Sequence, residues 1–148
     1  MGFESDKSIG FLIAKARNTL KSEFEKELKP YSLSYAHRII LVRLSEKEGL
    51  TQKELAQDTY FEQSNLTLML DKLELKGLVK RSAKENDRRA YIVTITPEGE
   101  KLRDALVRMG ETIMERALSG LNGGQKEELS QMLQRIYENL KCGSPYGE

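Results

Sequence analysis

Apolar residues recur every three or four positions near the start of the chain. Between residues 8 and 28 this spacing is typical of one face of an amphipathic helix. The pattern stops before Pro30, because the residue that precedes a proline disfavours helical angles. Ser34 is a common N-cap residue, and it precedes a second apolar pattern that ends near Gly49. The sequence therefore predicts two helices before residue 50.

Two further helices are predicted close together in the middle of the chain. Thr51 and Glu54 have the spacing of a capping box, in which each side chain bonds the backbone amide of the other, and about seven helical residues should follow. A longer helix is expected from about Glu62 to Gly77, with leucine and methionine on its apolar face. Two short helices joined by a tight turn have the outline of a helix-turn-helix.

The segments "LVKRS" (78–82) and "AYIVTIT" (90–96) are rich in β-branched and aromatic residues. They predict the two strands of a hairpin. The fold class is therefore mainly α with a small β-hairpin wing: a winged helix-turn-helix with further helices at both ends of the chain.

The helices after the hairpin have clear start and stop signals. Thr96 followed by Pro97 predicts a helix that runs to about Leu121. Asn122, with Gln125 three residues on, marks a break in the helical pattern, and a last helix is predicted over 129–140. The final segment "CGSPYGE" is expected to fray.

Composition narrows the class of protein. The chain has 148 residues, 32% of them charged and 39% hydrophobic, with a net charge of +1, which fits a single folded domain. No secretion signal is visible and no apolar stretch is long enough to span a bilayer, so a cytoplasmic protein with no membrane partner is expected. One cysteine, Cys142, and one histidine, His37, predict neither an internal disulfide nor a metal site.

Catalytic signatures are missing from the sequence as well. With one histidine and one cysteine near the end of the chain there is no Ser–His–Asp or Cys–His set, and no GxxxxGK[ST] loop occurs. The sequence therefore predicts a protein that is not an enzyme and needs no cofactor.

Charge is unevenly distributed around the hairpin. Between Lys72 and Arg89 seven basic residues outnumber three acidic ones, an excess of four in a nearly neutral chain. Such a local excess is what neutralisation of DNA phosphates requires. The charge alone is equally compatible with a solvated hairpin whose lysines maintain solubility.

Residue identities in the same region favour DNA. The segments "LTQKELAQDTYFEQSNLTLMLDKLELKGLVKR" and "DRRAYIVTITPEGEKL" resemble the MarR (multiple antibiotic resistance regulator) family of transcription factors. The most specific positions lie in the wing and its exit: Asp87, Arg89, Val93, Ile95, Thr96, Pro97 and Gly99. The resemblance covers about a third of the chain. It implies a single MarR-like chain over 1–148, with DNA bound by 33–96 and a homodimer formed by 5–30 and 97–141.

The resemblance also assigns DNA contacts residue by residue. Arg89 is expected to reach the minor groove from the wing, oriented by a salt bridge to Asp87, while Arg88 contacts a phosphate or is a mobile surface charge. The start of the longer central helix is expected to meet base edges. Leu68 departs from a frequent arginine, and either contact with a thymine methyl or simple packing remains open. The other expected DNA contacts are Thr51, Gln52, Gln63, Ser64, Asn65, Thr67, Lys72 and Lys84.

Members of the family are often released from DNA by small phenolic or aromatic ligands. By position, the candidates for such an effector site are Arg17 on the first predicted helix and Tyr35, His37 and Arg38 at the start of the second. Their side chains can pair with a carboxylate or bond a phenol. Each of them could instead be an ordinary interface residue. The predicted function is a homodimeric repressor that binds a pseudo-palindromic double-stranded DNA operator. The alternative is a winged-helix protein-interaction module without sequence-specific DNA binding.

Overall fold

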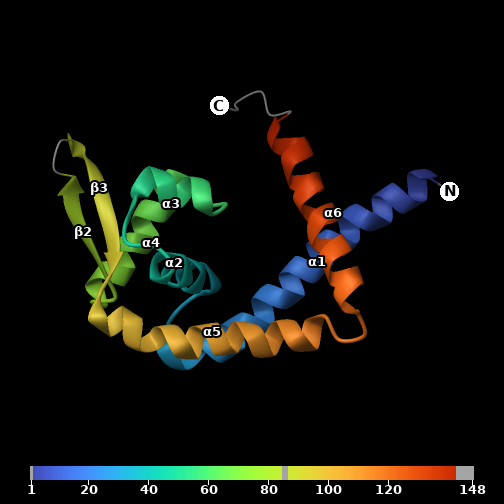
Figure 1. Cartoon of the computed structure of the whole chain (residues 1–148), viewed down its shortest axis with the longest axis horizontal. Helices are drawn as coiled ribbons and strands as arrows, with labels where there is room; N and C mark the ends of the chain where they lie inside the picture. Colours follow the sequence, from blue (N-terminus) through green and yellow to red (C-terminus); the bar gives the residue numbers. More distant parts are fainter. Residues whose placement is uncertain (1, 85–86, 143–148) are drawn as a thin grey trace. The chain divides into compact units, whose positions relative to one another are not determined.

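The computed structural model describes residues 2–84 and 87–142, and it describes side chains over residues 8–83 and 91–141 (Figure 1). The described chain divides into two compact units, 1–113 and 114–148, which are treated separately below. The elements in chain order are α1 (Gly2–Leu28), η1 (Lys29–Tyr31), α2 (Tyr35–Ser45), β1 (Leu50–Thr51), α3 (Gln52–Asp58), α4 (Gln63–Leu75), β2 (Val79–Lys84), β3 (Asp87–Ile95), α5 (Pro97–Ala117) and α6 (Gly123–Cys142).

The helix starts predicted from the capping residues Ser34 and Thr51 are confirmed. Ser34 Oγ accepts the His37 amide at 3.2 Å, and His37 Nδ1 accepts the Ser34 amide at 3.0 Å, so α2 begins with a capping box closed by a histidine. Thr51 and Glu54 exchange two bonds of 3.0 Å each at the start of α3. These reciprocal bonds satisfy backbone amides that a helix N-terminus otherwise leaves without partners.

The predicted winged helix-turn-helix fold is present, with α2, α3 and α4 followed by the strands β2 and β3. Helices α3 and α4 are followed by Gly77, whose φ of +73° belongs to the left-handed region that favours glycine after a helix. The Gly77 amide donates to the Glu74 carbonyl at 2.9 Å, and the Leu78 amide donates to the Leu73 carbonyl at 3.0 Å. These two bonds turn the chain directly into β2.

The sheet has three strands rather than the two of the predicted hairpin. Its order is β1–β3–β2, all antiparallel, and Leu50 and Thr51 pair with Val93 and Ile92. The strand β1 was missed because two residues are too short for an alternating pattern to be recognised. It ties the start of α3 to the wing strand β3.

Several predicted boundaries were wrong. Helix α2 ends at Ser45 rather than near Gly49, and α5 ends at Ala117 rather than Leu121. Helix α6 begins at Gly123, not at Leu129, because Asn122 and Gln125 exchange two bonds of 2.9 Å that cap it. Cys142 is the last residue of α6 rather than part of a tail, and the rest of that predicted tail lies outside the described residues.

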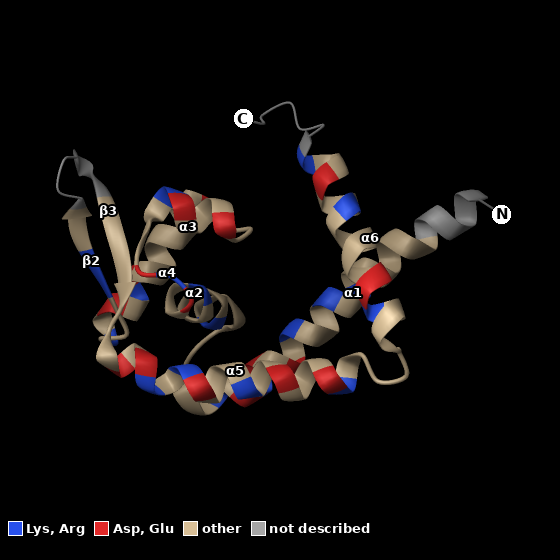
Figure 2. Cartoon of the chain, viewed as in Figure 1, with Lys and Arg blue, Asp and Glu red and all other residues tan. Residues whose placement is uncertain are grey.

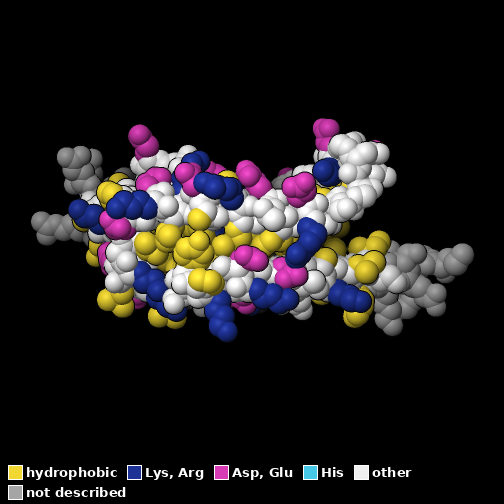
Figure 3. Space-filling view, turned by 90° about the horizontal axis from the view of Figure 1, so that it is seen from below, with side chains coloured by type: hydrophobic (Ala, Val, Ile, Leu, Met, Phe, Trp, Pro, Cys, Tyr) yellow, Lys and Arg dark blue, Asp and Glu magenta, His cyan; other side chains and the backbone are white. Residues whose placement is uncertain are grey.

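The hydrophobic core of the first unit lies where α1, α2, α3, α4, α5 and the sheet meet. Large side chains with relative exposures of 2% or less come from each of these elements: Phe24, Leu28, Ile40, Leu41, Leu44, Leu55, Leu66, Leu70, Leu73, Val79, Val93 and Leu106. In the second unit, by contrast, none of the side chains described in α6 is buried. Figure 3 shows hydrophobic side chains gathered in a strip between charged ones on one face of the molecule.

Candidate nucleic-acid interface

Helix α4 has two chemically distinct faces. Leu66, Leu70 and Leu73 are completely buried. The residues predicted to meet base edges are instead all exposed: Gln63, Ser64, Asn65, Thr67 and Leu68. Helix α4 is thus held in the core by its leucines, and the polar side chains of its first half are exposed. Hydrogen-bonding side chains at the start of a second helix are the means by which helix-turn-helix proteins read the major groove.

Two of the predicted DNA contacts are bonded to each other. Thr67 Oγ1 donates to the Gln63 carbonyl at 3.0 Å, and Gln52 Nε2 donates to Thr67 Oγ1 at 2.5 Å. Because Thr67 has only one hydroxyl proton, it must accept from the Gln52 amide group. This bond links the first residue of α3 to α4 and fixes how the Gln52 carboxamide is turned. Thr51, one residue earlier, is committed to capping α3.

An arginine that was not singled out as a contact ties the wing to α4. Arg81 on β2 binds the carboxylate of Asp71 and lies 2.9 Å from Glu74 Oε1, and its backbone amide donates to Glu74 Oε2 at 3.2 Å. Hydrogen bonds from Arg81 lower the pKa of Glu74, and the same bond to Glu74 raises the pKa of Arg81. Arg81 thereby neutralises two acids on the proposed DNA-binding helix.

Sequence reasoning counted Arg81 only as part of the local positive charge. Asp71 and Glu74, three residues apart, lie on one face of a helix, which was the available signal for a shared cationic partner.

Basic residues also lie along β2, whereas acidic and basic residues are mixed on α5 (Figure 2). Lys72 and Lys80 are exposed, at the end of α4 and on β2 respectively. For Asp87, Arg88 and Arg89 the structure describes the backbone, within β3, but not the side chains.

Lys84 is the last residue of β2, and a register shift between Ala83 and Lys84 places it opposite Asp87. The side chain of Lys84 also lies outside the described part. The DNA contacts assigned to the wing tip therefore stay predictions.

Arg38, one of the effector candidates, is bonded within the core of the first unit. Its Nε and Nη2 donate to the Leu106 carbonyl on α5 at 3.1 and 2.9 Å, and its guanidinium carbon lies 4.6 Å from the centre of the Phe24 ring. A Cβ at Gly110 would lie 2.1 Å from Nη2, so the arginine occupies space that only a glycine leaves open. Burial lowers the pKa of Arg38. Arg38 thus joins α1, α2 and α5.

Tyr35 lies on the same side of α2 as Arg38. Its ring centre is 4.9 Å from that of Phe24, and its amide donates to Glu25 Oε2 at 3.4 Å. Burial and the neighbouring Tyr60 raise the pKa of Tyr35, while the charges of Arg38 and Arg17 act in the opposite direction. Tyr35, Arg38 and the exposed Arg17 are therefore within electrostatic range of one another.

His37 has a different environment. It is buried, and its ring is bonded to Ser34. Burial, followed by the positive charges of Lys72 on α4 and of Lys76 just after that helix, lowers the pKa of His37. The structure places Tyr35 and Arg38 against the same Phe24 ring, shows Arg17 acting on Tyr35 only through its charge, and places His37 in a structural cap.

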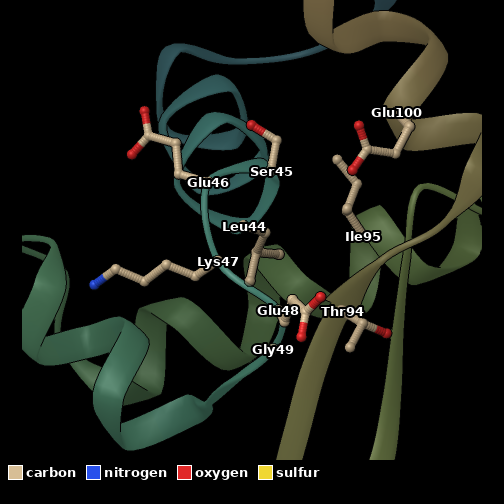
Figure 4. Close-up of a pocket in the computed structure, with 9 residues that line it drawn as sticks. All are labelled: Leu44, Ser45, Glu46, Lys47, Glu48, Gly49, Thr94, Ile95 and Glu100. Atoms are coloured by element: carbon tan, nitrogen blue, oxygen red, sulfur yellow. The ribbon is translucent and has the colours of Figure 1, made fainter.

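A separate cavity of about 430 Å³ lies between the α2–β1 turn, β3 and the start of α5 (Figure 4). Glu46, Glu48 and Glu100 contribute carboxylates to its wall. Lys47 points away from the cavity, toward Asp58 at 3.5 Å. Within the described ranges no group of three or more histidine, cysteine or acidic residues could hold a metal ion.

The helices that the structure describes include none that is both long and apolar enough to cross a membrane.

Comparison with known proteins agrees with the geometry. The MarR family model matches residues 33–91, the region from the start of α2 into β3. The HTH-type transcriptional repressor Rv2887 of Mycobacterium tuberculosis is 30% identical over 139 residues, covering 92% of this chain and 98% of the repressor. The organic hydroperoxide resistance transcriptional regulator of Bacillus subtilis is 28% identical, covering 88% of this chain and 86% of the regulator.

A solved structure of Bordetella bronchiseptica BpsR, described as regulated in DNA binding by 6-hydroxynicotinic acid, superimposes with a TM-score of 0.80. The match covers 87% of this chain and 92% of BpsR at 22% identity, so it supports the fold. Fold and relatives together define a winged helix-turn-helix transcriptional regulator, not an enzyme. The chain belongs to the MarR family.

Proposed function

We propose that this regulator is a repressor that binds a pseudo-palindromic DNA operator as a homodimer in the cytoplasm. The observation that carries the proposal is the exposed polar face of α4, where Gln63, Ser64, Asn65 and Thr67 are available for hydrogen bonds to DNA. Residues 33–96 would bind DNA, and residues 5–30 and 97–141 would form the dimer. Repressor function is supported by the relative Rv2887, which is named a repressor.

Dimerisation is supported by apolar side chains that the single chain leaves uncovered. In α1 these are Ile9, Phe11, Leu12 and Ile13, with exposures between 39% and 66%. In α6 they are Met132, Leu133, Ile136, Tyr137 and Leu140. Soluble monomers rarely leave such contiguous apolar patches in water. A second copy would cover these helices and would place two α4 helices about one DNA turn apart.

An effector site is proposed around Arg17 and Tyr35. Arg17 would pair with a carboxylate and the Tyr35 hydroxyl would bond a phenol or carbonyl. Arg38 would form a wall of the site, because its guanidinium is already bonded to the Leu106 carbonyl. The proposed ligand is a small aromatic acid. The 6-hydroxynicotinic acid named in the description of BpsR belongs to this class.

The test is fluorescence anisotropy with duplex DNA from the protein's own promoter region and a scrambled duplex, at several salt concentrations. The full-length protein should prefer the promoter duplex, and binding should weaken steeply with salt because phosphate contacts release counterions. Arg89→Ala should cost about 1–3 kcal/mol of binding, and Arg88→Ala should lower the salt slope by about one unit. Lys126→Ala, which removes an exposed charge on α6, is the matched control and should bind as the wild type does.

The same assay separates the rival functions. Weak binding that is equal on the promoter duplex, the scrambled duplex and duplexes selected from a random pool would favour a module that contacts proteins. Addition of aromatic carboxylic acids to a bound complex tests the effector site. Release by such an acid that persists in Arg17→Ala would contradict the role given to Arg17.

A further inference from the structure

Leu68 differs from the leucines that hold α4 in place. Leu66, Leu70 and Leu73 have no exposed surface, whereas the Leu68 residue is 69% exposed. A leucine in water contributes almost nothing to the hydrophobic stabilisation of the fold, because that contribution scales with the apolar area removed from water. Packing, one of the two explanations that the sequence left open for Leu68, therefore accounts for only a small part of its surface within the described chain.

The surroundings of Leu68 are polar. Ser64 and Asn65 lie one helical turn before it, and Lys72 lies one turn after it, all of them exposed. The adjacent Thr67 is bonded to Gln52 and to the Gln63 carbonyl. A single exposed leucine needs no special explanation elsewhere on a protein surface. Here it interrupts the hydrogen-bonding face of the helix expected to enter the major groove.

The major groove displays one apolar group, the 5-methyl of thymine. Leucine has no donor or acceptor for a phosphate or for a polar base edge, so the thymine methyl is the group in the groove that it matches. Asp71 and Glu74, the acids further along α4, do not contact the DNA bases in place of Leu68, because both are paired with Arg81.

We propose that Leu68 is a specificity residue that reads a thymine in each half-site through its 5-methyl group. This inference rests on the proposed function, since it requires α4 to occupy the major groove. Replacement of that thymine by uracil removes only the methyl and leaves every hydrogen-bonding group of the base pair unchanged.

The probe is a duplex selected from a random pool for binding to the full-length protein, synthesised with thymine or with deoxyuridine at single positions. Wild-type protein should bind more weakly to the duplex with uracil at one position per half-site. The expected loss is about fourfold for each methyl that is no longer buried, or about fifteenfold for a symmetric pair. Leu68→Ala should bind the thymine and uracil duplexes with nearly equal affinity.

Leu75→Ala is the matched control, because it removes the same side chain from the same helix at a residue that is 89% exposed. Position 75 lies about 10 Å further along the axis, at the end of α4. This variant should keep the wild-type preference for thymine.

The outcomes distinguish the inference from the function on which it rests. Selective binding by the wild type with no thymine–uracil difference at any position would overturn the role of Leu68 alone. An equal difference in Leu68→Ala and in wild-type protein would do the same. Failure to select any preferred duplex would overturn the proposed function and this inference with it. Circular dichroism and thermal unfolding of both variants would show that the helical fold is retained.

Discussion

The single side chain of His37 is expected to make the stability of this protein sensitive to acid. Its neutral Nδ1 accepts the Ser34 amide, a bond that a protonated ring cannot accept. Burial and then Lys72 and Lys76 lower its pKa from the ordinary value of 6.5. The unfolded chain therefore takes up this proton first as the pH falls. The contribution of the neutral His37 cap to the free energy of unfolding is complete above about pH 6.5. It is lost as the pH falls toward the lower pKa that His37 has in the folded state.

The prediction is that the free energy of unfolding of untagged protein, measured with urea, declines by about 1 kcal/mol from this group below neutral pH. His37 is the only histidine of the chain, so His37→Gln removes the titration without altering another imidazole. The variant should be less stable at neutral pH and should show a smaller decline between about pH 7.5 and 5.5. Identical pH profiles for the two proteins would show that the cap does not respond to protonation.

Among the elements, the joint between β2 and α4 depends on Arg81. Its bonds to Asp71 and Glu74 hold the base of the wing against the helix expected to read DNA. Replacement by methionine keeps the length of the side chain but removes the charge. Arg81→Met should lower the free energy of unfolding by about 1 kcal/mol, because the three groups are partly exposed and solvent screens their attraction.

DNA affinity should respond more than stability does. Without Arg81, Asp71 and Glu74 would face phosphates as uncompensated anions, and binding should weaken by about tenfold. The double variant Arg81→Met with Glu74→Gln should recover part of that affinity, measured by anisotropy. Lys80→Met, which removes the neighbouring charge on the same strand, should leave the unfolding free energy unchanged. No recovery in the double variant would show that Arg81 acts by contacting DNA itself.

Element starts were predictable from the sequence where a short-range bond determines them. The caps at Ser34 and Thr51 each join residues three positions apart, so the pattern contains the whole interaction. The cap at Asn122 was recognised but was not taken as the start of α6. Interactions between distant segments were not predictable in this way. Strand β1 exists because β3 pairs with it, and Arg38 lies 68 positions from the carbonyl that it binds.

The same difference between local pattern and long-range interaction applies to the candidate site. The residues on α4 were placed correctly on an exposed surface because helical periodicity determines which side chains are turned away from the core. The effector candidates were chosen by chemical type and by their place on the first helix or at the start of the second, which is why His37 was grouped with Tyr35 and Arg38. Only the tertiary structure shows that His37 caps α2 instead.

For the whole molecule, α6 is the clearest argument that one chain is not the complete functional unit. Its apolar residues Met132, Leu133, Ile136, Tyr137 and Leu140 are between 37% and 74% exposed, and they recur at the spacing of one helix face. A helix with such a stripe usually buries it against another element, and the proposed partner is a second copy of the chain.

The final prediction concerns this face. Sedimentation of wild-type protein should give about twice the mass of the 16.9 kDa chain. Leu133→Glu places a charge in the apolar stripe, where burial without a partner is unfavourable, and should shift the protein toward the monomer. Gln134→Glu adds the same charge one residue away, outside the stripe, and should leave the mass unchanged. Because a monomer can contact only one half-site at a time, Leu133→Glu should also lose affinity for the full operator while keeping that for an isolated half-site. A wild-type protein that sediments as a monomer at micromolar concentrations would mean that the stripe on α6 serves another partner.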